Sequence, residues 1–327
     1  MIAGGKDRSE LAYVLPLRRW HVEVDEEFVD YLGWLASRVR TIVVDGSDEP
    51  VFAAHHEAFG SLVTHIRVDP DLTGRYGKVN GVVTGLRAAG LEKVVIADDD
   101  VRYEAGGLDR MARLLDAADL VRPQNYFWPL PWHARWDTAR TLVNRAFGAD
   151  YPGTLGVRRS RLLEVGGYDG DCLFENLELI RTIEAVGGRV VTPLDFYVRR
   201  LPPSARHFWS QRVRQAYDSF AQPVRMTVEL AVVPTVTALV VRGRSKALAL
   251  GTASAVALAE AGRRRAGGTA VFPPVCSLFA PLWLGERGVC VWFAVWNRMA
   301  RGGVPYAGTV LSKAANSKRQ IRQRLAR

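Results

Sequence analysis

The sequence predicts an α/β fold, a sheet with helices on both faces, followed by a helical region of different composition. Short apolar runs alternate with segments of helical periodicity in the first half of the chain, as in folds built from strands and crossing helices. Charge divides the chain as well: residues 1–195 carry 23 Lys and Arg against 30 Asp and Glu, whereas residues 196–327 carry 21 against 4. This asymmetry favours an anionic surface as partner of the second part. Hydrophobic residues make up 48% of the 327 residues, which excludes a disordered chain.

Four apolar runs of the first half have the length and composition of buried strands. They are residues 11–17, 41–48, 62–68 and 93–100. Helical spacing predicts helices at residues 24–39, 105–116 and 173–186. Another helix is expected after a glycine-rich loop that begins at Gly74, and it ends at Gly90. The helix at residues 173–186 closes at two glycines, as C-cap preferences favour. Residues 121–137 are rich in proline and aromatic side chains, and we expect a shaped loop there.

From about Met226 the chain consists of apolar blocks separated by clusters of Arg and Lys. The blocks are residues 226–241, 246–262, 269–284 and 289–296, each shorter than the roughly 20 residues that a membrane-spanning helix needs. Basic clusters beside apolar helices are typical of segments that lie in an anionic membrane face. We therefore expect a globular domain at residues 1–222 and a membrane-associated helical region at residues 223–327. A soluble helical subdomain with solvated Arg side chains is the alternative.

The cysteines and the first residues concern the compartment of the protein. Cys172, Cys276 and Cys290 form no C-x-x-C pair, so reduced thiols are expected. The first ten residues are too polar for the apolar segment of a signal peptide, and we expect no export. With the basic apolar blocks, this predicts a location at the cytoplasmic face of the cell membrane.

Three adjacent carboxylates, Asp98, Asp99 and Asp100, end the buried run at residues 93–100 and precede Arg102. Adjacent acids repel one another unless a positive group lies among them. Carboxylates at positions i and i+2 of a strand end can reach one divalent cation, and oxygen ligands select Mg²⁺ or Mn²⁺, which in turn bind a diphosphate. Ligands also gather at the carboxyl ends of strands in such sheets. An acidic turn without a metal is the alternative.

The order of these motifs resembles that of the family-two inverting glycosyltransferases, which have a GT-A fold. LAYVLPL, TIVVDGSD, YGKVNG and VVIADDD follow one another as the corresponding motifs do in that family, over roughly residues 10–220. The resemblance implies a mixed sheet, a contact of Asp45 with the nucleotide base, and a place for Lys78 and Asp99 near the nucleotide-sugar donor. It also implies that Asp98 and Asp100 hold Mn²⁺ or Mg²⁺ and the sugar diphosphate. A UDP-sugar is the donor expected first.

A second set of motifs, GVRRS, GGYDGD and ENLEL, stands where the family has a strand, a turn and an E-D pair that opens a helix. The Asp of that pair is the family's general base, and here its position is Asn176, whose amide cannot accept a proton at neutral pH. Glu175 and Glu178 lie three residues apart on one helix face and are the substitute bases that we expect. Asp169 and Asp171 are weaker candidates. Compensation of the helix dipole is the alternative role for Glu175.

The segment HFWSQRVRQAY at residues 207–217 resembles the Q/R-x-x-R-W motif of membrane-bound members, with Gln215 in the place of tryptophan. The resemblance implies that Arg214 holds the departing diphosphate and that Gln211 lies near the donor. A solvated Arg on a basic helix is the alternative. With the C-terminal apolar blocks, the chain resembles the ceramide-glucosyltransferase-like branch, although its polar first residues do not resemble that branch's N-terminal anchor.

These features predict a metal-dependent glycosyltransferase that moves a sugar from a nucleotide diphosphate to a hydroxyl of a lipid-like acceptor, with inversion. A polyprenyl phosphate or a soluble glycan is the alternative acceptor. A binder of nucleic acid or of another acidic surface, without enzymatic activity, is the alternative of another class. Apolar blocks between the Arg clusters do not suit a phosphate backbone, and the sequence has no zinc or recognition-helix motif, so we expect no nucleic-acid partner.

Overall fold

The computed structural model describes residues 10–306 and 308–326, so the expectation about export, which rests on the first ten residues, falls almost wholly outside it. Within this part lies a seven-stranded sheet of order β3-β2-β1-β4-β8-β6-β9. The first four strands of that order are parallel, and β8 runs antiparallel to β4 and β6. The strands are β1 Leu11–Leu17, β2 Arg40–Asp45, β3 Thr64–Arg67, β4 Lys93–Ala97, β6 Leu120–Val121, β8 Thr154–Arg158 and β9 Val190–Val191. The mixed α/β sheet confirms the predicted fold class.

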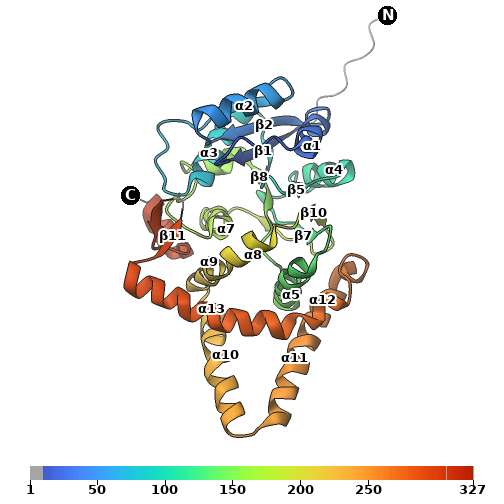
Figure 1. The fold of residues 1–327 in the computed structure, drawn as a ribbon. Helices are drawn as coiled ribbons and strands as arrows, with labels where there is room; N and C mark the ends of the chain where they lie inside the picture. Colours follow the sequence, from blue (N-terminus) through green and yellow to red (C-terminus); the bar gives the residue numbers. More distant parts are fainter. Residues whose placement is uncertain (1–9, 307, 327) are drawn as a thin grey trace, which may run out of the picture.

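Helices cover both faces of this sheet (Figure 1). The side chains of β1 alternate between two apolar clusters, Ala12 and Val14 in one and Tyr13 and Leu15 in the other, as the two-residue period of a strand requires. A Cβ on Gly85 would overlap Val14, so the glycine lets its helix approach β1 closely. The helices are α1 Glu26–Ala36, α2 Glu49–Phe59, α3 Gly77–Ala89, α4 Ala105–Leu114, α6 Arg159–Leu163 and α7 Glu175–Ala185.

Residues 121–137 are not the irregular loop that their prolines predict. They contain β7 (Gln124–Phe127), which pairs in a small sheet with β10 (Tyr197–Arg200), itself paired with β5 (Val101–Arg102). They also contain the beginning of α5 (Trp132–Phe147). The expectation was wrong because the prolines flank these elements instead of interrupting them: Pro131 is the N-cap of α5, where the lack of an N–H group does no harm.

The C-terminal helices are longer than the apolar blocks of the sequence. α10 (Pro223–Val241) and α11 (Ser245–Arg264) form a hairpin that projects away from the sheet, and α13 (Ala280–Arg301) crosses its base (Figure 1). Within the described part of the chain, α10 is the one helix long and apolar enough to cross a membrane, by length and composition only, and 6% of its apolar window is buried. The expectation that every block is too short is therefore wrong for α10. The shorter helices are α8 Ala205–Ser210, α9 Arg212–Tyr217 and α12 Val275–Leu278.

The chain after α13 returns to the sheet. β11 (Val304–Tyr306) and β12 (Thr309–Leu311) form a small hairpin, and α14 (Lys318–Leu325) packs beside α7. Val304, Leu311 and Ala314 are buried in the same apolar cluster as α3 and α7. We call residues 303–326 the tail. Because the tail packs against the first domain, the region after residue 222 does not lie apart from residues 1–222 as an independent appendage.

Candidate active site

Two adjoining cavities lie at the carboxyl end of β4. The arginine cavity, of about 360 Å³, is lined by Asp98, Asp100 and Glu175 and by several arginines of the C-terminal half. The strand-end cavity, of about 820 Å³, is lined by residues at the ends of β1 and β2 and by Asp98 and Asp99. Seven residues line both cavities: Lys78, Asp98, Asp99, His207, Gln211, Arg214 and Tyr306. Tyr76, whose ring stacks on that of Tyr306, lines only the arginine cavity. Seven of the residues predicted from the sequence thus lie in one place: Lys78, Asp98, Asp99, Asp100, Glu175, Gln211 and Arg214.

The carboxylates of the Asp triplet are neutralised by cations from other parts of the chain. Lys78 Nζ lies 2.5 Å from Asp98 Oδ1, and Arg200 Nη2 lies 3.2 Å from Asp98 Oδ2. Arg200 also donates from Nε, at 2.8 Å, to both oxygens of Asp100. Asp99 pairs with Arg19 at 2.6 Å. The positive groups among the acids are therefore Lys78, Arg200 and Arg19.

Arg102, the nearest cation in the sequence, faces away from the triplet's carboxylates. Its Nε and Nη2 donate to the carboxylate of Glu27, at 2.9 and 2.6 Å, and its Nη1 donates to the carbonyl oxygen of Asp99. Its guanidinium also lies over the ring of Tyr31, 4.6 Å from the ring centre. Arg102 therefore supports the turn that presents the carboxylates, and it does not neutralise them.

The two flanking carboxylates have different pKa values. Burial alone would raise the pKa of Asp98, but the charges of Lys78 and Arg200 outweigh burial and hold its pKa below the ordinary value. Burial raises the pKa of Asp100, and the neighbouring charge of Asp98 adds to this effect, so that Arg200 compensates only in part. Burial would lower the pKa of Lys78, but the negative charges of Asp98 and Glu175 outweigh burial and raise it, so that Lys78 stays charged. The cluster therefore holds fixed charges of both signs.

The donor set of this cluster fits a divalent metal. Asp98 and Asp100 both reach the one guanidinium of Arg200, so their carboxylates converge on a single cation. Oxygen ligands of this kind suit Mg²⁺ and Mn²⁺ and do not suit softer metals. The ligands still needed for six-fold coordination are ones that a diphosphate and water supply.

Glu175 and Asn176 open α7 on the wall of the arginine cavity. Glu175 is 7% exposed, and its Oε1 accepts a hydrogen bond of 2.5 Å from Lys78 Nζ. Asn176 also lines the cavity, and its Nδ2 donates to the carbonyl oxygen of Pro152 at 3.0 Å. The structure thus places the predicted Glu175 in the arginine cavity, where its carboxylate is a proton acceptor close to the Asp triplet.

Glu178 lines neither cavity. Its role as a base stays a prediction, which this geometry does not support. Its side chain is fully buried, and its two oxygens accept hydrogen bonds of 2.7 and 2.9 Å from the backbone N–H and Nδ2 of Asn316 in the tail. Both glutamates belong to the first turn of α7, but only Glu175 lines the cavity. Glu178 therefore tethers the tail.

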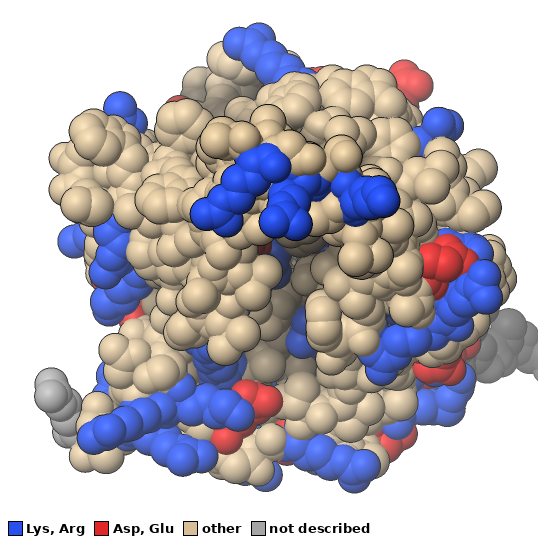
Figure 2. Space-filling view, turned by 90° about the horizontal axis from the view of Figure 1, so that it is seen from below, with Lys and Arg blue, Asp and Glu red and all other residues tan. Residues whose placement is uncertain are grey.

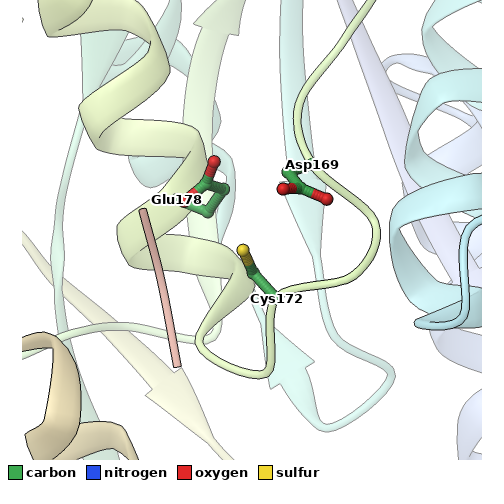
Figure 3. Close-up of side chains that lie close together, drawn as sticks. All are labelled: Asp169, Cys172 and Glu178. Atoms are coloured by element: carbon green, nitrogen blue, oxygen red, sulfur yellow. The ribbon is translucent and has the colours of Figure 1, made fainter. Parts of the chain in front are cut away.

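Asp169, Cys172 and Glu178 point toward one another and have the spacing of a cation site (Figure 3). The Asn316 amide already lies among them: Nδ2 donates to Asp169 Oδ2 at 2.8 Å and to Cys172 Sγ at 3.3 Å. Burial raises the pKa of Cys172, and the negative charge of Glu178 adds to the effect, so the thiol stays protonated. The cluster is therefore a hydrogen-bonded tether. It also explains why Asp169, a weaker candidate for the base, does not enter the cavities.

Asp45 lies at the end of β2, as predicted, but its carboxylate is fully buried. It accepts hydrogen bonds of 2.6 Å from His55 Nδ1 and 2.8 Å from the backbone N–H of Ser47, and His65 Nε2 lies at 3.3 Å. These contacts outweigh burial and lower the pKa of Asp45. Neighbouring Gly46 lines the strand-end cavity and Asp45 does not. The contact of Asp45 with a nucleotide base stays a prediction, which this geometry does not support.

Arg214 and Gln211 line both cavities. Among the described residues no carboxylate lies within ion-pair distance of Arg214, whose guanidinium lies 5.3 Å from the centre of the Tyr306 ring. Tyr306 in turn stacks on Tyr76, with ring centres 4.4 Å apart. Gln211 Oε1 is buried without a hydrogen-bond partner. The predicted segment thus presents to the cavities an unpaired cation, Arg214, which suits an anionic ligand, and an unpaired acceptor oxygen, Gln211 Oε1, which suits a hydroxyl or N–H donor.

Three residues of the site were not predicted. Arg200 is the last residue of β10, and no local pattern shows that it will meet Asp98 and Asp100 from about 100 residues away. Tyr306 comes from the tail, beyond the last apolar block. Asp218 follows Arg214 by one helical turn and lines the arginine cavity, and this spacing is the one signal that could have found it.

The comparisons with known proteins concern the fold. No family model and no curated protein matches the sequence. A mannosyltransferase from Pyrobaculum calidifontis, solved with GDP-Man and Mn²⁺, is similar over 88% of each chain, with a TM-score of 0.56 and 18% identity. Glucosyl-3-phosphoglycerate synthase from Mycobacterium tuberculosis is less similar, with a TM-score of 0.42, 16% identity, and 62% of this chain and 75% of that one covered. The first of these similarities shows that the protein has the GT-A fold.

Proposed function

We propose that the protein is a metal-dependent glycosyltransferase that takes its sugar from a nucleotide diphosphate. One observation carries the proposal: Asp98 and Asp100 at the end of β4 converge on one guanidinium, beside Lys78, in cavities at the carboxyl ends of the strands. Two carboxylates that share one cation of the protein are placed to share a metal ion. The GT-A fold, shared with a mannosyltransferase described with GDP-Man and Mn²⁺, supports the same function.

The residues of the site divide the chemistry among them. When bound, Mn²⁺ or Mg²⁺ offsets the negative charge that develops on the leaving diphosphate. Arg214, unpaired and directed at both cavities, donates to phosphate oxygens of the same group. Glu175 accepts the proton of an acceptor hydroxyl while the new bond forms opposite the departing diphosphate, which inverts the anomeric centre. For this, Glu175 exchanges its contact with Lys78 for one with the hydroxyl.

A nucleotide-sugar screen tests the proposal directly. We expect hydrolysis or transfer with one nucleotide sugar, first among them a UDP-sugar, in the presence of Mn²⁺, and none in the presence of a chelator. The screen uses the full chain with three acceptors of different kinds: a lipid with a free hydroxyl, a polyprenyl phosphate and a soluble glycan. Turnover of no nucleotide sugar under any condition would contradict the proposal.

We further propose that the α10–α11 hairpin attaches the protein to an anionic membrane, which supplies a lipid-like acceptor. Apolar side chains on the hairpin are exposed, among them Val224, Val240 and Val241 at 82%, 60% and 80%. The turn between the helices carries the exposed Arg242, Arg244 and Lys246. Figure 2 views the molecule from the hairpin side and shows Lys and Arg side chains on this face with uncharged surface between them. Such a face complements anionic headgroups with its cations and the acyl region with its apolar side chains.

Vesicle flotation tests this attachment. Each basic residue near an anionic surface contributes about 1 kcal/mol, so replacing the three basic residues of the turn by Gln should weaken binding to phosphatidylserine-containing vesicles on the order of 100-fold. Replacing three exposed arginines of the first domain, Arg38, Arg75 and Arg113, is the matched control and should leave binding unchanged. Equal losses in both triple variants would show general electrostatic attraction. Complete release of the wild type by high salt would show an electrostatic binder and contradict insertion of the apolar side chains.

A further inference from the structure

Two buried arginines differ in how the fold satisfies them. Arg145 of α5 is 0% exposed and, within the described part of the chain, donates five hydrogen bonds, to the oxygens of Gln124, Leu194, Tyr197, Gly262 and Arg265. Arg287 of α13 is also 0% exposed, but its Nη2 makes one long bond, 3.4 Å, to Gln215 Oε1. Its Nε and Nη1 have no hydrogen-bond partner. Among the described residues, no carboxylate lies within ion-pair distance of Arg287.

The unsatisfied guanidinium belongs to the wall of the arginine cavity, and a second arginine lies beside it. Arg287 and Arg225 of α10 both line this cavity, and neither lines the strand-end cavity. Their guanidinium carbons lie 5.9 and 6.0 Å from the ring centre of Trp283, so the two cations flank one indole. The arginine cavity thus has a cationic part, at Arg225 and Arg287, that is distinct from the Asp triplet.

Four carboxylates, those of Glu229, Glu286, Asp218 and Asp137, interact electrostatically with Arg287, but none of them is hydrogen-bonded to it in the described part of the chain. Glu229 accepts from Arg225 Nε at 2.8 Å and from the Ser219 hydroxyl at 2.6 Å. Glu286 lies 3.2 Å from the Nε of Arg212. Burial lowers the pKa of Arg287 to about 10, an effect to which the charges of Arg212 and Arg225 add and which Glu286 and Glu229 offset only in part. Burying a cation whose hydrogen-bond donors have no partner costs free energy, and an anion that accepts from these donors removes that cost.

We propose that Arg287 and Arg225 bind a phosphate group of the acceptor, which makes the acceptor a phosphorylated molecule. The inference rests on the proposed function and narrows its acceptor. A phosphate presents several charged oxygens, which match the paired donors of two guanidinium groups, whereas a lipid with hydroxyl groups alone leaves the buried cation uncompensated. The donor diphosphate has its own cations at Lys78 and Arg214, which line both cavities. The phosphate is carried either by a lipid or by a soluble ester, and the recognition chemistry is the same for both.

Calorimetry with two probes tests the inference without turnover. The probes are inorganic phosphate and octyl phosphate in phosphatidylcholine vesicles, with octanol in the same vesicles as the uncharged reference. The variants are Arg287→Gln, the less buried Arg225→Gln, and Arg214→Gln, with Arg301→Gln as the control because Arg301 is an exposed arginine of the same helix, α13. Nucleotide binding is titrated in parallel for each variant.

We expect a phosphate probe to bind the wild type roughly tenfold to a hundredfold more tightly than Arg287→Gln, since charge-assisted hydrogen bonds are lost. Arg301→Gln should bind as the wild type does. Arg214→Gln should lose nucleotide binding and keep octyl phosphate, whereas Arg287→Gln should do the reverse, so that a failure of the donor site is told apart from a failure of this one. If Arg287→Gln does not fold, the loss of phosphate binding is measured with Arg225→Gln instead.

The two probes also distinguish the source of the phosphate. Preference for octyl phosphate supports a phosphorylated lipid, and equal binding of inorganic phosphate supports a soluble phosphate ester. Equal affinity of the wild type and of the folded Arg287 and Arg225 variants for both probes would overturn the inference. Binding of octanol as tight as that of octyl phosphate would overturn it as well.

Discussion

The first 222 residues and the rest of the chain contribute differently to the site. The first part supplies acids that are already paired: Asp98 with Lys78 and Arg200, and Asp99 with Arg19. The part after residue 222 supplies Arg287, which lacks a carboxylate partner, and the aromatic ring of Tyr306. The comparison teaches that the C-terminal region is part of the site, because it completes the cavities and is hydrogen-bonded to the segment that leads into α7.

The largest effect is expected from removing the tail. The backbone N–H groups of Leu173 and Phe174, directly before Glu175, donate to carbonyl oxygens of Lys313 and Ala314 at 3.0 and 2.8 Å. Deleting residues 303–327 removes these bonds, the Asn316 tether and several buried apolar side chains, each contributing about 1.5–3 kcal/mol. We expect loss of cooperative unfolding in urea. A deletion of only the hairpin turn, residues 242–246 replaced by two glycines, is the control and should fold. A tail-less chain with a normal unfolding transition would show that the two regions are independent.

The next effect concerns which of the two glutamates of α7, Glu175 or Glu178, accepts the proton. Glu175→Gln should reduce transfer ~100- to 10,000-fold, the range of a positioned proton acceptor, while leaving nucleotide binding near that of the wild type. Glu178→Gln should keep transfer and lower the free energy of unfolding by about 1–3 kcal/mol, since one of its bonds to Asn316 then faces an amide N–H₂ group. Transfer rates, nucleotide titration and urea unfolding of the two variants separate these roles. A catalytic defect in Glu178→Gln with normal stability would reverse the assignment.

The third effect, on the pH dependence of stability, concerns Asp218, in the 3-10 helix Asp218–Ala221 after α9. Burial raises its pKa to about 7, although Arg214 opposes the shift. Between about pH 4 and pH 7, Asp218 is protonated in the folded protein and ionised in the unfolded chain. Its contribution to the free energy of unfolding is therefore full below about pH 4 and is lost as the pH rises to about 7. Between pH 4 and pH 8, the free energy of unfolding of the wild type should fall by about 2–4 kcal/mol more than that of Asp218→Asn. Urea unfolding of both proteins across this range measures it, and parallel stability curves would contradict the shift.

Much of the first part could be predicted from the sequence because its signals are local. The apolar runs that became β1, β2 and β4 carry β-branched and aliphatic side chains, and the Asp triplet follows directly on one of them. Helical periodicity placed Glu175 at the start of α7, and the motif at residues 207–217 placed Gln211 and Arg214. The strands and the helix need only a period of two or 3.6 residues and a break in it, whereas the roles of Gln211 and Arg214 are what the resemblance to a family motif implies.

The rest depends on contacts between distant segments, which periodicity does not contain. Arg200 meets Asp100 across 100 residues, and Asn316 meets Glu178 across 138. The two histidines beside Asp45 belong to α2 and β3, and a strand-end pattern does not show that an acid has such internal partners. The burial of Arg287 is not visible in the sequence for the same reason, since a basic residue between two apolar blocks is equally compatible with a solvated side chain.

The most direct test of the central claim is nucleotide-sugar turnover by Asp100→Asn, measured as nucleotide release during a Mn²⁺ titration. The substitution preserves the shape of the side chain and removes the charge that faces Arg200. We predict turnover by the wild type that rises with Mn²⁺ and vanishes with a chelator, and a loss of roughly 100-fold or more in Asp100→Asn. Asp116→Asn, which alters an exposed partner of Lys93, is the control and should turn over normally. Full turnover by Asp100→Asn, or by the wild type in chelator, would contradict a metal-dependent glycosyltransferase built on this cluster.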